Sequence, residues 1–305
     1  MATTFCIGLT VLYYMDLVQG LEPMNFMAFT GLAALVAVVF FVDDLRDLSA
    51  MVKLALQTLT AVAFVATVAH VERLWIPGYG LIEFGALGPL LTILWIVGFM
   101  NTLNCLDGVN GLASGGTLIA SLILGTIAYH TDGMLVLLLC ALLFASTLGF
   151  FVFNFPAGRI FMGDVGSQFI GFVFACVAVF GANLEVGRIS FYVVPILFYG
   201  FIFDFMMTFI LRLLRRKDVF SAHREHLFQI CDRLGVSNTF VCLIYLCFFI
   251  LNGLVAVVAQ FSEPWYRLLL VLGLFPVYAI YGIYVYRLAL RHGLFQTTTA
   301  RSGNS

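Results

Sequence analysis

Charged residues are scarce in this sequence. Only 10% of the 305 residues are Asp, Glu, Lys or Arg, whereas 62% are hydrophobic. Soluble domains carry about 25% charged residues, so this composition excludes an ordinary soluble protein and indicates a membrane protein. The net charge of -1 and the lack of a long basic run argue against binding to nucleic acid, and we expect no such partner.

Metal-binding cysteine patterns and a secretory signal are also lacking. The seven cysteines show no CxxC or CxxxH spacing, so we expect them to pack between helices as small hydrophobic residues. No Lys or Arg precedes Arg46, so the apolar N-terminus has no basic segment of the kind that begins a signal peptide. We interpret it as a transmembrane helix whose upstream flank is missing, since the apolar run 5–17 is shorter than the roughly 20 residues of a full span.

Long uncharged stretches recur along the chain. They are continuously apolar rather than alternating, which favours helices over a membrane β-barrel. We therefore predict an all-α, polytopic membrane bundle of about ten transmembrane helices, with a single membrane domain at 1–288 and a short cytoplasmic tail at 289–305. The predicted spans are 4–19, 25–42, 54–71, 85–103, 113–130, 135–153, 166–184, 190–212, 239–260 and 268–286.

Basic residues are distributed unevenly between the two ends of these spans. If residue 1 is cytoplasmic, twelve of the 15 Lys and Arg residues fall in cytoplasmic segments, and only Arg73, Arg188 and Arg267 fall on the opposite side. Cytoplasmic loops of membrane proteins carry such an excess. We expect both termini in the cytoplasm, and external loops that are short and carry no functional cluster.

Four polar clusters fall on the predicted cytoplasmic side, and we expect an active site there. The first is Asp43-Asp44-Leu45-Arg46-Asp47 at the end of a span. Its carboxylates repel one another unless a cation or a proton transfer uses them. A solvated helix end is the alternative interpretation.

The second cluster runs from Asn101 to Gly111. Asn101, Asn104 and Asp107 are spaced i, i+3, i+6, so one helix face presents two amides and a carboxylate. Such a face suits a hard cation or a ribose and base, and Gly108 lets the backbone approach a ligand closely. Helix capping is the alternative.

The third and fourth clusters surround later helix ends. Asp164, in a Gly-Asp-x-Gly-Ser segment, begins a predicted helix, which it could cap or where it could hold a magnesium-bound phosphate. His223, Arg224 and His226 can bind a pyrophosphate or a lipid phosphate, and no zinc spacing surrounds them. We expect Asp204, inside an apolar run, to support a neighbouring Arg or His rather than to be catalytic.

Taken in order, the four clusters resemble the motifs of a known enzyme superfamily. The segments Val42-Asp43-Asp44-x-x-Asp47, Asn101-x-x-Asn104-x-x-Asp107-Gly-x-Asn110-Gly, Phe161-Met-Gly-Asp164-x-Gly-Ser and His223-Arg224-x-His226-Leu resemble those of the polyprenyl-phosphate N-acetylhexosamine-1-phosphate transferases. The similarity covers about residues 25–235. Four ordered motifs are far more specific than any one of them.

The resemblance implies an activity and a location. A UDP-N-acetylhexosamine would donate its sugar 1-phosphate to undecaprenyl phosphate and release UMP, with Mg²⁺ as cofactor and Mn²⁺ as the alternative ion. The site would face the cytoplasm from the bacterial inner membrane. The His-Arg-x-His form is similar to the branch that initiates O-antigen, capsule or enterobacterial common antigen chains, whose donors are UDP-GlcNAc, UDP-FucNAc and UDP-QuiNAc. The resemblance leaves open whether the chain forms a homodimer.

The resemblance also assigns residue roles. Asn104 and Asp164 would bind the metal, and Asp43, Asp44 and Asp107 would be catalytic, the first two beside the lipid phosphate. The residues expected to bind the nucleotide or other substrate groups are Lys53, Asn101, Gly108, Asn110, His223, Arg224 and His226.

Two features depart from the family pattern. Asn110 stands where bacterial members usually have a second Asp, and an upstream span and a His-x-x-Pro-x-Pro-Arg-Gly-Gly-like loop do not appear. We expect an eleven-span protein that has lost its first helix. The alternatives are an inactive truncated homologue and an ion-coupled transporter, which would have a midplane site between repeated halves.

Overall fold

The computed structural model describes residues 1–18, 22–76, 79–218 and 224–294, and nearly all regular structure in them is helical. One two-stranded antiparallel hairpin, β1 (Arg73–Ile76) with β2 (Gly80–Glu83), interrupts the predicted all-α pattern within these ranges. The helices are α1 (Ala2–Tyr14), α2 (Pro23–Arg46), α3 (Ala50–Thr67), α4 (Leu87–Leu106), α5 (Leu112–His130), α6 (Met134–Asn154), α7 (Gly163–Asn183), α8 (Val193–Leu197), α9 (Tyr199–Leu214), α10 (Leu227–Arg233), α11 (Asn238–Phe261) and α12 (Pro264–Arg291).

Each predicted span corresponds to helical structure. Among the described residues, eight helices are long and apolar enough to cross a membrane. The predicted span 4–19 forms the shorter helix α1, of 13 residues, and the predicted span 190–212 is divided at Phe198 into α8 and α9. Pro195 lies in the first turn of α8, where its missing N–H would have no helical partner, so a helix can begin at Val193. The chain is a polytopic helical membrane protein.

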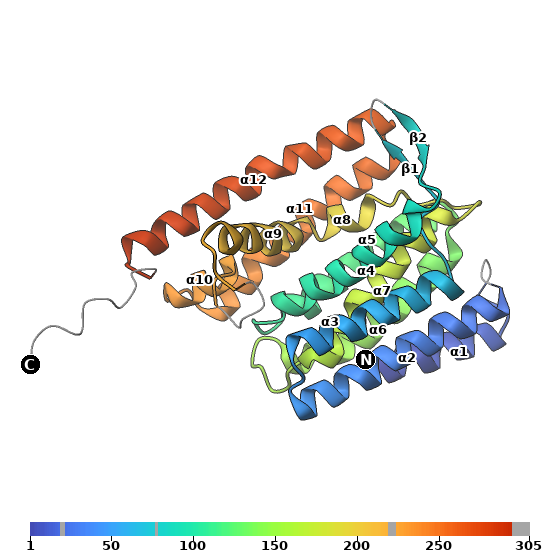
Figure 1. The fold of residues 1–305 in the computed structure, drawn as a ribbon, viewed down its shortest axis with the longest axis horizontal. Coiled ribbons are helices and arrows are strands. Elements are labelled where there is room, and N and C mark those ends of the chain that lie inside the picture. The colour runs from blue at the N-terminus through green and yellow to red at the C-terminus, as the bar shows by residue number, and fades with distance from the viewer. Residues whose placement is uncertain (19–21, 77–78, 219–223, 295–305) are drawn as a thin grey trace, which may run out of the picture.

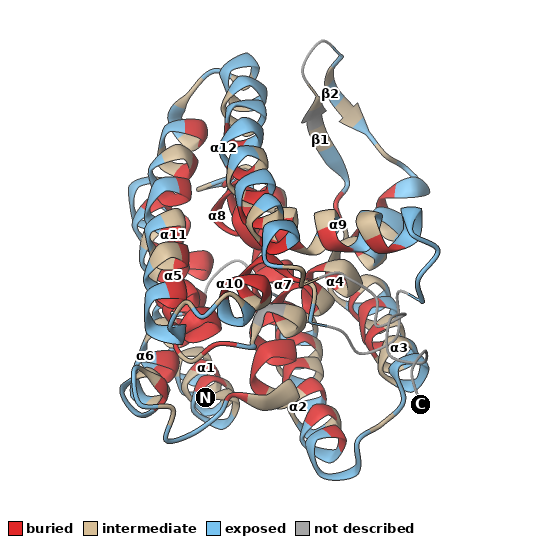
Figure 2. Ribbon diagram, turned by 90° about the vertical axis from the view of Figure 1, so that its left-hand side faces the viewer, coloured by how far each residue is buried: buried red, intermediate tan, exposed pale blue. Residues whose placement is uncertain are grey.

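Helix α7 is the centre of the bundle. Every residue from Gly166 to Ala182 is buried, and Figure 2 shows this helix surrounded by the others. Both α2 and α4 pack along it. A Cβ atom on Gly171 would lie only 2.9 Å from the Cα atom of Met100, so glycine allows α4 and α7 to approach closely. This contact sets the second half of α4 beside the first half of α7.

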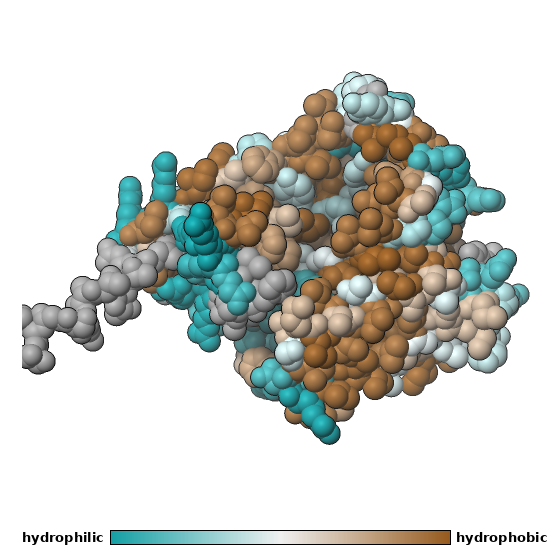
Figure 3. All heavy atoms as spheres, in the orientation of Figure 1, coloured by the Kyte–Doolittle hydropathy of each residue, from teal (hydrophilic) through white to brown (hydrophobic). Residues whose placement is uncertain are grey.

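The two ends of the bundle differ in sequence content. Figure 1 shows the hairpin at one end, and at the other the C-terminal ends of α2, α4 and α9 with the N-terminal ends of α3 and α7. Figure 3 shows mostly hydrophobic residues across the middle of one face and hydrophilic residues toward both ends. We call the two ends the hairpin end, with residues 73–83, and the motif end, with residues 43–53, 101–111 and 154–167.

Candidate active site at the motif end

Four helix ends bring the predicted acids and amides together. Asp43 and Asp44 lie in the last turn of α2, and Lys53 lies in the first turn of α3. Asn104 lies in the last turn of α4, and Asp164 lies in the first turn of α7. Consecutive spans run in opposite directions, so C-terminal and N-terminal helix ends alternate at this end of the bundle.

Lys53 joins two of the acids. Its Nζ atom lies 2.8 Å from Oδ2 of Asp43 and 2.7 Å from Oδ2 of Asp164. Asn104 donates its Nδ2–H to the other oxygen of Asp164, Oδ1, at 2.9 Å, and to Oγ of Ser167 at 3.1 Å. Side chains from α2, α3, α4 and α7 are therefore held in one charged network.

Asp43 is the buried member of this network. Only 2% of the residue is exposed, and its Oδ1 atom accepts a hydrogen bond from the backbone N–H of Leu48 at 2.9 Å. Asp47, at the end of α2, adopts a left-handed conformation with φ of 50°. The carboxylate of Asp43 thus fixes the turn between α2 and α3 and, through Lys53, the position of α7.

Asp44 caps α7 from a different helix. Its two carboxylate oxygens accept hydrogen bonds from the backbone N–H groups of Asp164 at 2.8 Å and Val165 at 3.2 Å. Gly163 has φ of 66°, and a Cβ atom there would lie 2.5 Å from Oδ2 of Asp44. Only glycine permits this approach. Asp44 therefore positions Asp164. The alternative, in which Asp164 itself caps α7, is wrong, since Asp44 makes the hydrogen bonds to the N-terminal end of this helix.

Asp107 follows α4 and faces a second side of the same region. With Asn104, Asn110 and Asp164 it lines a cavity of about 220 Å³. Burial, together with repulsion from the carboxylates of Asp164 and Asp44, raises the pKa of Asp107 well above its usual range. Asn101 and Asn104 belong to α4, but Asp107 comes after its last residue, Leu106, with non-helical dihedral angles, so the predicted i, i+3, i+6 stripe on one helix face does not extend to Asp107.

Asn154 organises the loop that contains Gly108 and Asn110. Its Oδ1 atom accepts hydrogen bonds from the N–H of Gly111 at 2.7 Å and from Oγ of Ser114 at 3.0 Å, while its Nδ2 donates to the carbonyl of Ile160 at 2.9 Å. A Cβ atom on Gly108 would meet the ring of Phe228 at 2.7 Å, so this glycine packs against α10. The second and third sequence clusters are thereby held against each other.

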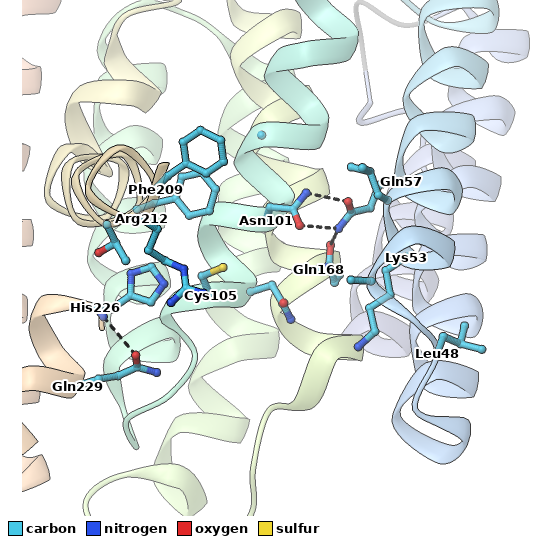
Figure 4. Close-up of a pocket in the computed structure, with 16 residues that line it drawn as sticks. Leu48, Lys53, Gln57, Asn101, Cys105, Gln168, Phe209, Arg212, His226 and Gln229 are labelled. Carbon is cyan, nitrogen blue, oxygen red and sulfur yellow. Dashed lines mark hydrogen bonds between the residues drawn. The ribbon is translucent and has the colours of Figure 1, made fainter. Parts of the chain in front are cut away.

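A larger cavity of about 580 Å³ opens between α3, α4 and α9 (Figure 4). Asn101, Gln57 and Gln168 form a hydrogen-bonded group that lines it (Figure 4). Nδ2 of Asn101 donates to Oε1 of Gln57 at 2.7 Å, and Nε2 of Gln57 donates to Oε1 of Gln168 at 3.0 Å. Asn104 lines both cavities. The larger cavity is lined by Leu48, Ala50, Lys53, Leu54, Gln57, Gly98, Asn101, Asn104, Cys105, Gln168, Phe205, Thr208, Phe209, Arg212, His226 and Gln229.

His226 closes the far side of this cavity. Its Nδ1 atom lies 3.4 Å from Oδ1 of Asp204, which also accepts the N–H of Leu227 at 2.9 Å, while Tyr245 donates its hydroxyl to the other oxygen of Asp204 at 2.9 Å. Burial lowers the pKa of His226, but the contacts with Asp204 and Cys105 outweigh it and raise this pKa to about 9. Asp204 supports a histidine, as expected from the sequence.

Of the other two predicted residues in the fourth cluster, only Arg224 is among the described residues. Arg224 is exposed and lines neither of the two cavities, and His223 lies outside the described residues. Arg212 instead reaches the larger cavity, and its Nη1 atom lies 3.1 Å from Oε2 of Glu225. Sequence reasoning missed Arg212, Gln57 and Gln168 as cavity residues. Polar side chains inside apolar runs were the available signal for all three.

A magnesium ion bound together with a substrate phosphate fits these residues. Among the described residues, no three His, Cys, Asp or Glu side chains form a metal site on their own. Mg²⁺ is usually bound through one or two carboxylates plus phosphate oxygens, and Asp164 with Asn104 offers that kind of partial set. The three linked carboxylates of Asp43, Asp44 and Asp164 also outnumber the single ammonium of Lys53.

The model of glycosyl transferase family 4 matches residues 26–182, a little over half of the chain, which include Asp43, Asp107 and Asp164. The chain belongs to glycosyl transferase family 4. The resemblance carried by the four motifs is therefore confirmed at the level of the family. Three of the four motifs fall inside the matched residues, and the fourth, around His226, lies beyond them.

Similar proteins of this family are named as sugar-phosphate transferases. The chain is 33% identical over 247 residues to a probable undecaprenyl-phosphate N-acetylglucosaminyl 1-phosphate transferase of Bacillus subtilis, covering 80% of this chain and 68% of that protein. It is 32% identical over 164 residues to the phospho-N-acetylmuramoyl-pentapeptide-transferase of Streptococcus uberis, and 37% identical over 137 residues to that of Lacticaseibacillus paracasei. The chain spans 49% and 43% of these two relatives' lengths, and they cover 49% and 44% of it.

Proposed function

We propose that this chain transfers N-acetylhexosamine 1-phosphate from a UDP-sugar to undecaprenyl phosphate and releases UMP. The observation that carries the proposal is the network in which Lys53 bridges Asp43 and Asp164, with Asn104 and Asp107 beside it. Acidic and amide oxygens with one ammonium, beside two adjoining cavities, suit a diphosphate donor and a phosphate acceptor. We further propose that the motif end faces the cytoplasm of a bacterial inner membrane.

The two cavities suit the two substrates. The larger one combines the apolar side chains of Leu54, Phe205 and Phe209 with the basic Arg212 and Lys53, a lining that favours the phosphate and first isoprene units of a lipid. The smaller cavity, with the amide of Asn110 and the backbone of Gly108, suits the uridine of the donor. Asn104 lines both cavities, so the phosphates of the two substrates would meet beside it.

The net reaction makes and breaks one phosphorus–oxygen bond. An oxygen of undecaprenyl phosphate bonds to the sugar-bearing phosphorus of the donor, and the phosphoanhydride bond to UMP breaks. When bound, Mg²⁺ would neutralise charge on the diphosphate, and Asp164 and Asn104 are the residues that would hold it. Lys53 and Arg212 would neutralise the charge of the acceptor phosphate, and His226, which lines the same cavity, would contact this phosphate in its charged form. Asp44 would keep Asp164 in place.

The identity of the sugar is a finer part of the proposal. The Bacillus subtilis relative, which is named for N-acetylglucosamine, is matched over more of the chain than the two pentapeptide transferases. This coverage supports a donor whose N-acetylhexosamine carries no peptide, namely UDP-GlcNAc, UDP-FucNAc or UDP-QuiNAc. The product would then initiate a cell-envelope polysaccharide.

Release of UMP tests the proposal. Purified protein is supplied with undecaprenyl phosphate, MgCl₂ and each of the three UDP-sugars, and UMP and the lipid product are measured together. Asp164→Asn should insert normally but lose at least about a hundredfold in turnover, because it removes the charge nearest the diphosphate. Asp132→Asn, the same change at an exposed position toward the hairpin end, should retain activity. Normal turnover in Asp164→Asn, or no UMP with any donor, would overturn the proposal.

A further inference from the structure

Three arginines gather around one cavity at the hairpin end. Arg73, Arg188 and Arg267 are the three basic residues that the sequence assigns to this side of the membrane. All three line a cavity of about 200 Å³ bounded by the β1–β2 hairpin, the end of α7, the loop before α8 and the start of α12. The three arginines on this side of the membrane therefore share one cavity.

None of these guanidinium groups is paired with a carboxylate at salt-bridge distance in the described residues, and the charge of Glu263 acts on Arg267 only from farther away. Glu83 is paired with Arg73 in the register of the hairpin, yet no salt bridge joins them. Three positive charges around one cavity would attract an anion into it.

Hydrogen bonds hold the arginine-bearing segments in position. The side chain of Gln260 accepts from the N–H of Ser190 at 2.9 Å and donates to the carbonyl of Arg188 at 3.1 Å. Arg267 donates to the carbonyl of Ser262 at 3.3 Å and to that of Gln260 at 3.3 Å. The loop before α8, the end of α11 and the start of α12 are thus tied together, which prepares the cavity for a ligand.

The surroundings of the cavity favour a lipid headgroup. Trp265 and Tyr266, next to Arg267, are 59% and 60% exposed, and such aromatic residues mark the headgroup level of a bilayer. Leu81, which lines the cavity, is 52% exposed. A cavity of about 200 Å³ has room for a phosphate group.

We propose that this cavity binds the phosphate group of an anionic phospholipid in the leaflet opposite the motif end. Guanidinium groups bind phosphate oxygens through paired, charge-assisted hydrogen bonds, and arginines from β1, the loop before α8 and α12 would surround the phosphate. The bound lipid would join the hairpin to α12, which are distant in sequence. This proposal does not depend on the transferase activity.

Thermal unfolding of detergent-solubilised protein tests the proposal. The unfolding midpoint is measured as phosphatidylglycerol, phosphatidylcholine or inorganic phosphate is added to three proteins. These are the wild type, the hairpin-end variant Arg73→Gln/Arg188→Gln/Arg267→Gln, and the control variant Arg216→Gln/Arg287→Gln/Arg291→Gln. The last variant removes the same charge at the motif end, from exposed positions. Phosphatidylglycerol should stabilise the wild type and this control equally. The hairpin-end variant should need about tenfold or more phosphatidylglycerol for half of the shift.

Each other outcome bears on the proposal. Equal phosphatidylglycerol dependence in all three proteins would overturn it, and so would equal stabilisation by phosphatidylcholine. Stabilisation by inorganic phosphate alone, lost in the hairpin-end variant, would show an anion site for free phosphate and refute the lipid assignment. If the triple variant does not fold, the single variant Arg188→Gln, at an exposed position, should show a severalfold weaker response, and an unchanged response would count against the proposal.

Discussion

Lys53 gives the sharpest test of the charged network at the motif end. Lys53→Met keeps the aliphatic stem and removes the ammonium that lies 2.8 Å from Asp43 and 2.7 Å from Asp164. The Asp43 side chain is only 1% exposed, so its carboxylate would remain buried without a cation. Removing one partner of a buried ion pair costs about 3–5 kcal/mol. Because Lys53 is 25% exposed, we expect the free energy of unfolding to fall by about 2–4 kcal/mol.

Titration with sodium dodecyl sulfate in mixed micelles would measure this loss. The matched control is Lys217→Met, since Lys217 forms a 2.6 Å ion pair with Glu225 but is 42% exposed and should lose only about 0–1 kcal/mol. In Lys53→Met/Asp43→Asn no buried charge remains unpaired, so its loss should be about 1–3 kcal/mol smaller than the sum of the two single losses. Additive losses, or equal losses in the two Lys→Met variants, would refute the reasoning.

Three further predictions concern α7 and His226. Gly163→Ala places a Cβ atom 2.5 Å from Oδ2 of Asp44, at a residue whose φ is 66°. This change should lower the free energy of unfolding by about 1–3 kcal/mol and reduce UMP release. The control Gly149→Ala, with open space around the added Cβ atom, should do neither. Gly171→Val should push the backbone of α4 away from α7 and so move Asn104 away from Asp164. Turnover should then fall about 10- to 100-fold. The control Gly273→Val, with open space around the added side chain, should keep its turnover. Because Asp204 and Cys105 raise the pKa of His226 from 6.5 to about 9, the stabilisation from its charged form is complete below pH 6.5 and is lost as the pH rises through about 9. The unfolding midpoint of the wild type should therefore decrease over this interval more than that of His226→Gln, and parallel curves would contradict the pairing.

The membrane helices could be predicted because their signal is local. A continuous apolar run of about 20 residues must be helical in lipid, whatever it packs against. The break at Phe198 and the β1–β2 hairpin lie outside that rule, since one is a local change in the backbone, where Phe198 has φ of -97° and ψ of 16°, and the other comes from pairing across a short loop. The sequence also did not predict that α12 continues to Arg291, beyond the predicted end of its span at residue 286.

The site was predictable as a set of residues but not as a set of contacts. Alternating helix direction places Asp43, Asp107 and Asp164 at one end of the bundle, and this follows from the order of the spans. Which of them is bridged, capped or left facing a cavity depends on the close packing of α4 on α7, which no periodicity reveals. Asp44 was expected beside the lipid phosphate, yet both of its oxygens accept backbone N–H groups of α7.

The ammonium between Asp43 and Asp164 has a consequence for how such a chain reaches its working state. A protein that carries its own counter-ion on a covalent tether can insert and assemble in a compartment poor in divalent ions. An arriving ion would then compete with a side chain that cannot diffuse away, and the phosphates that it accompanies would tip that competition. If Mg²⁺ binds as proposed, folding of the chain and binding of the ion would be separate steps.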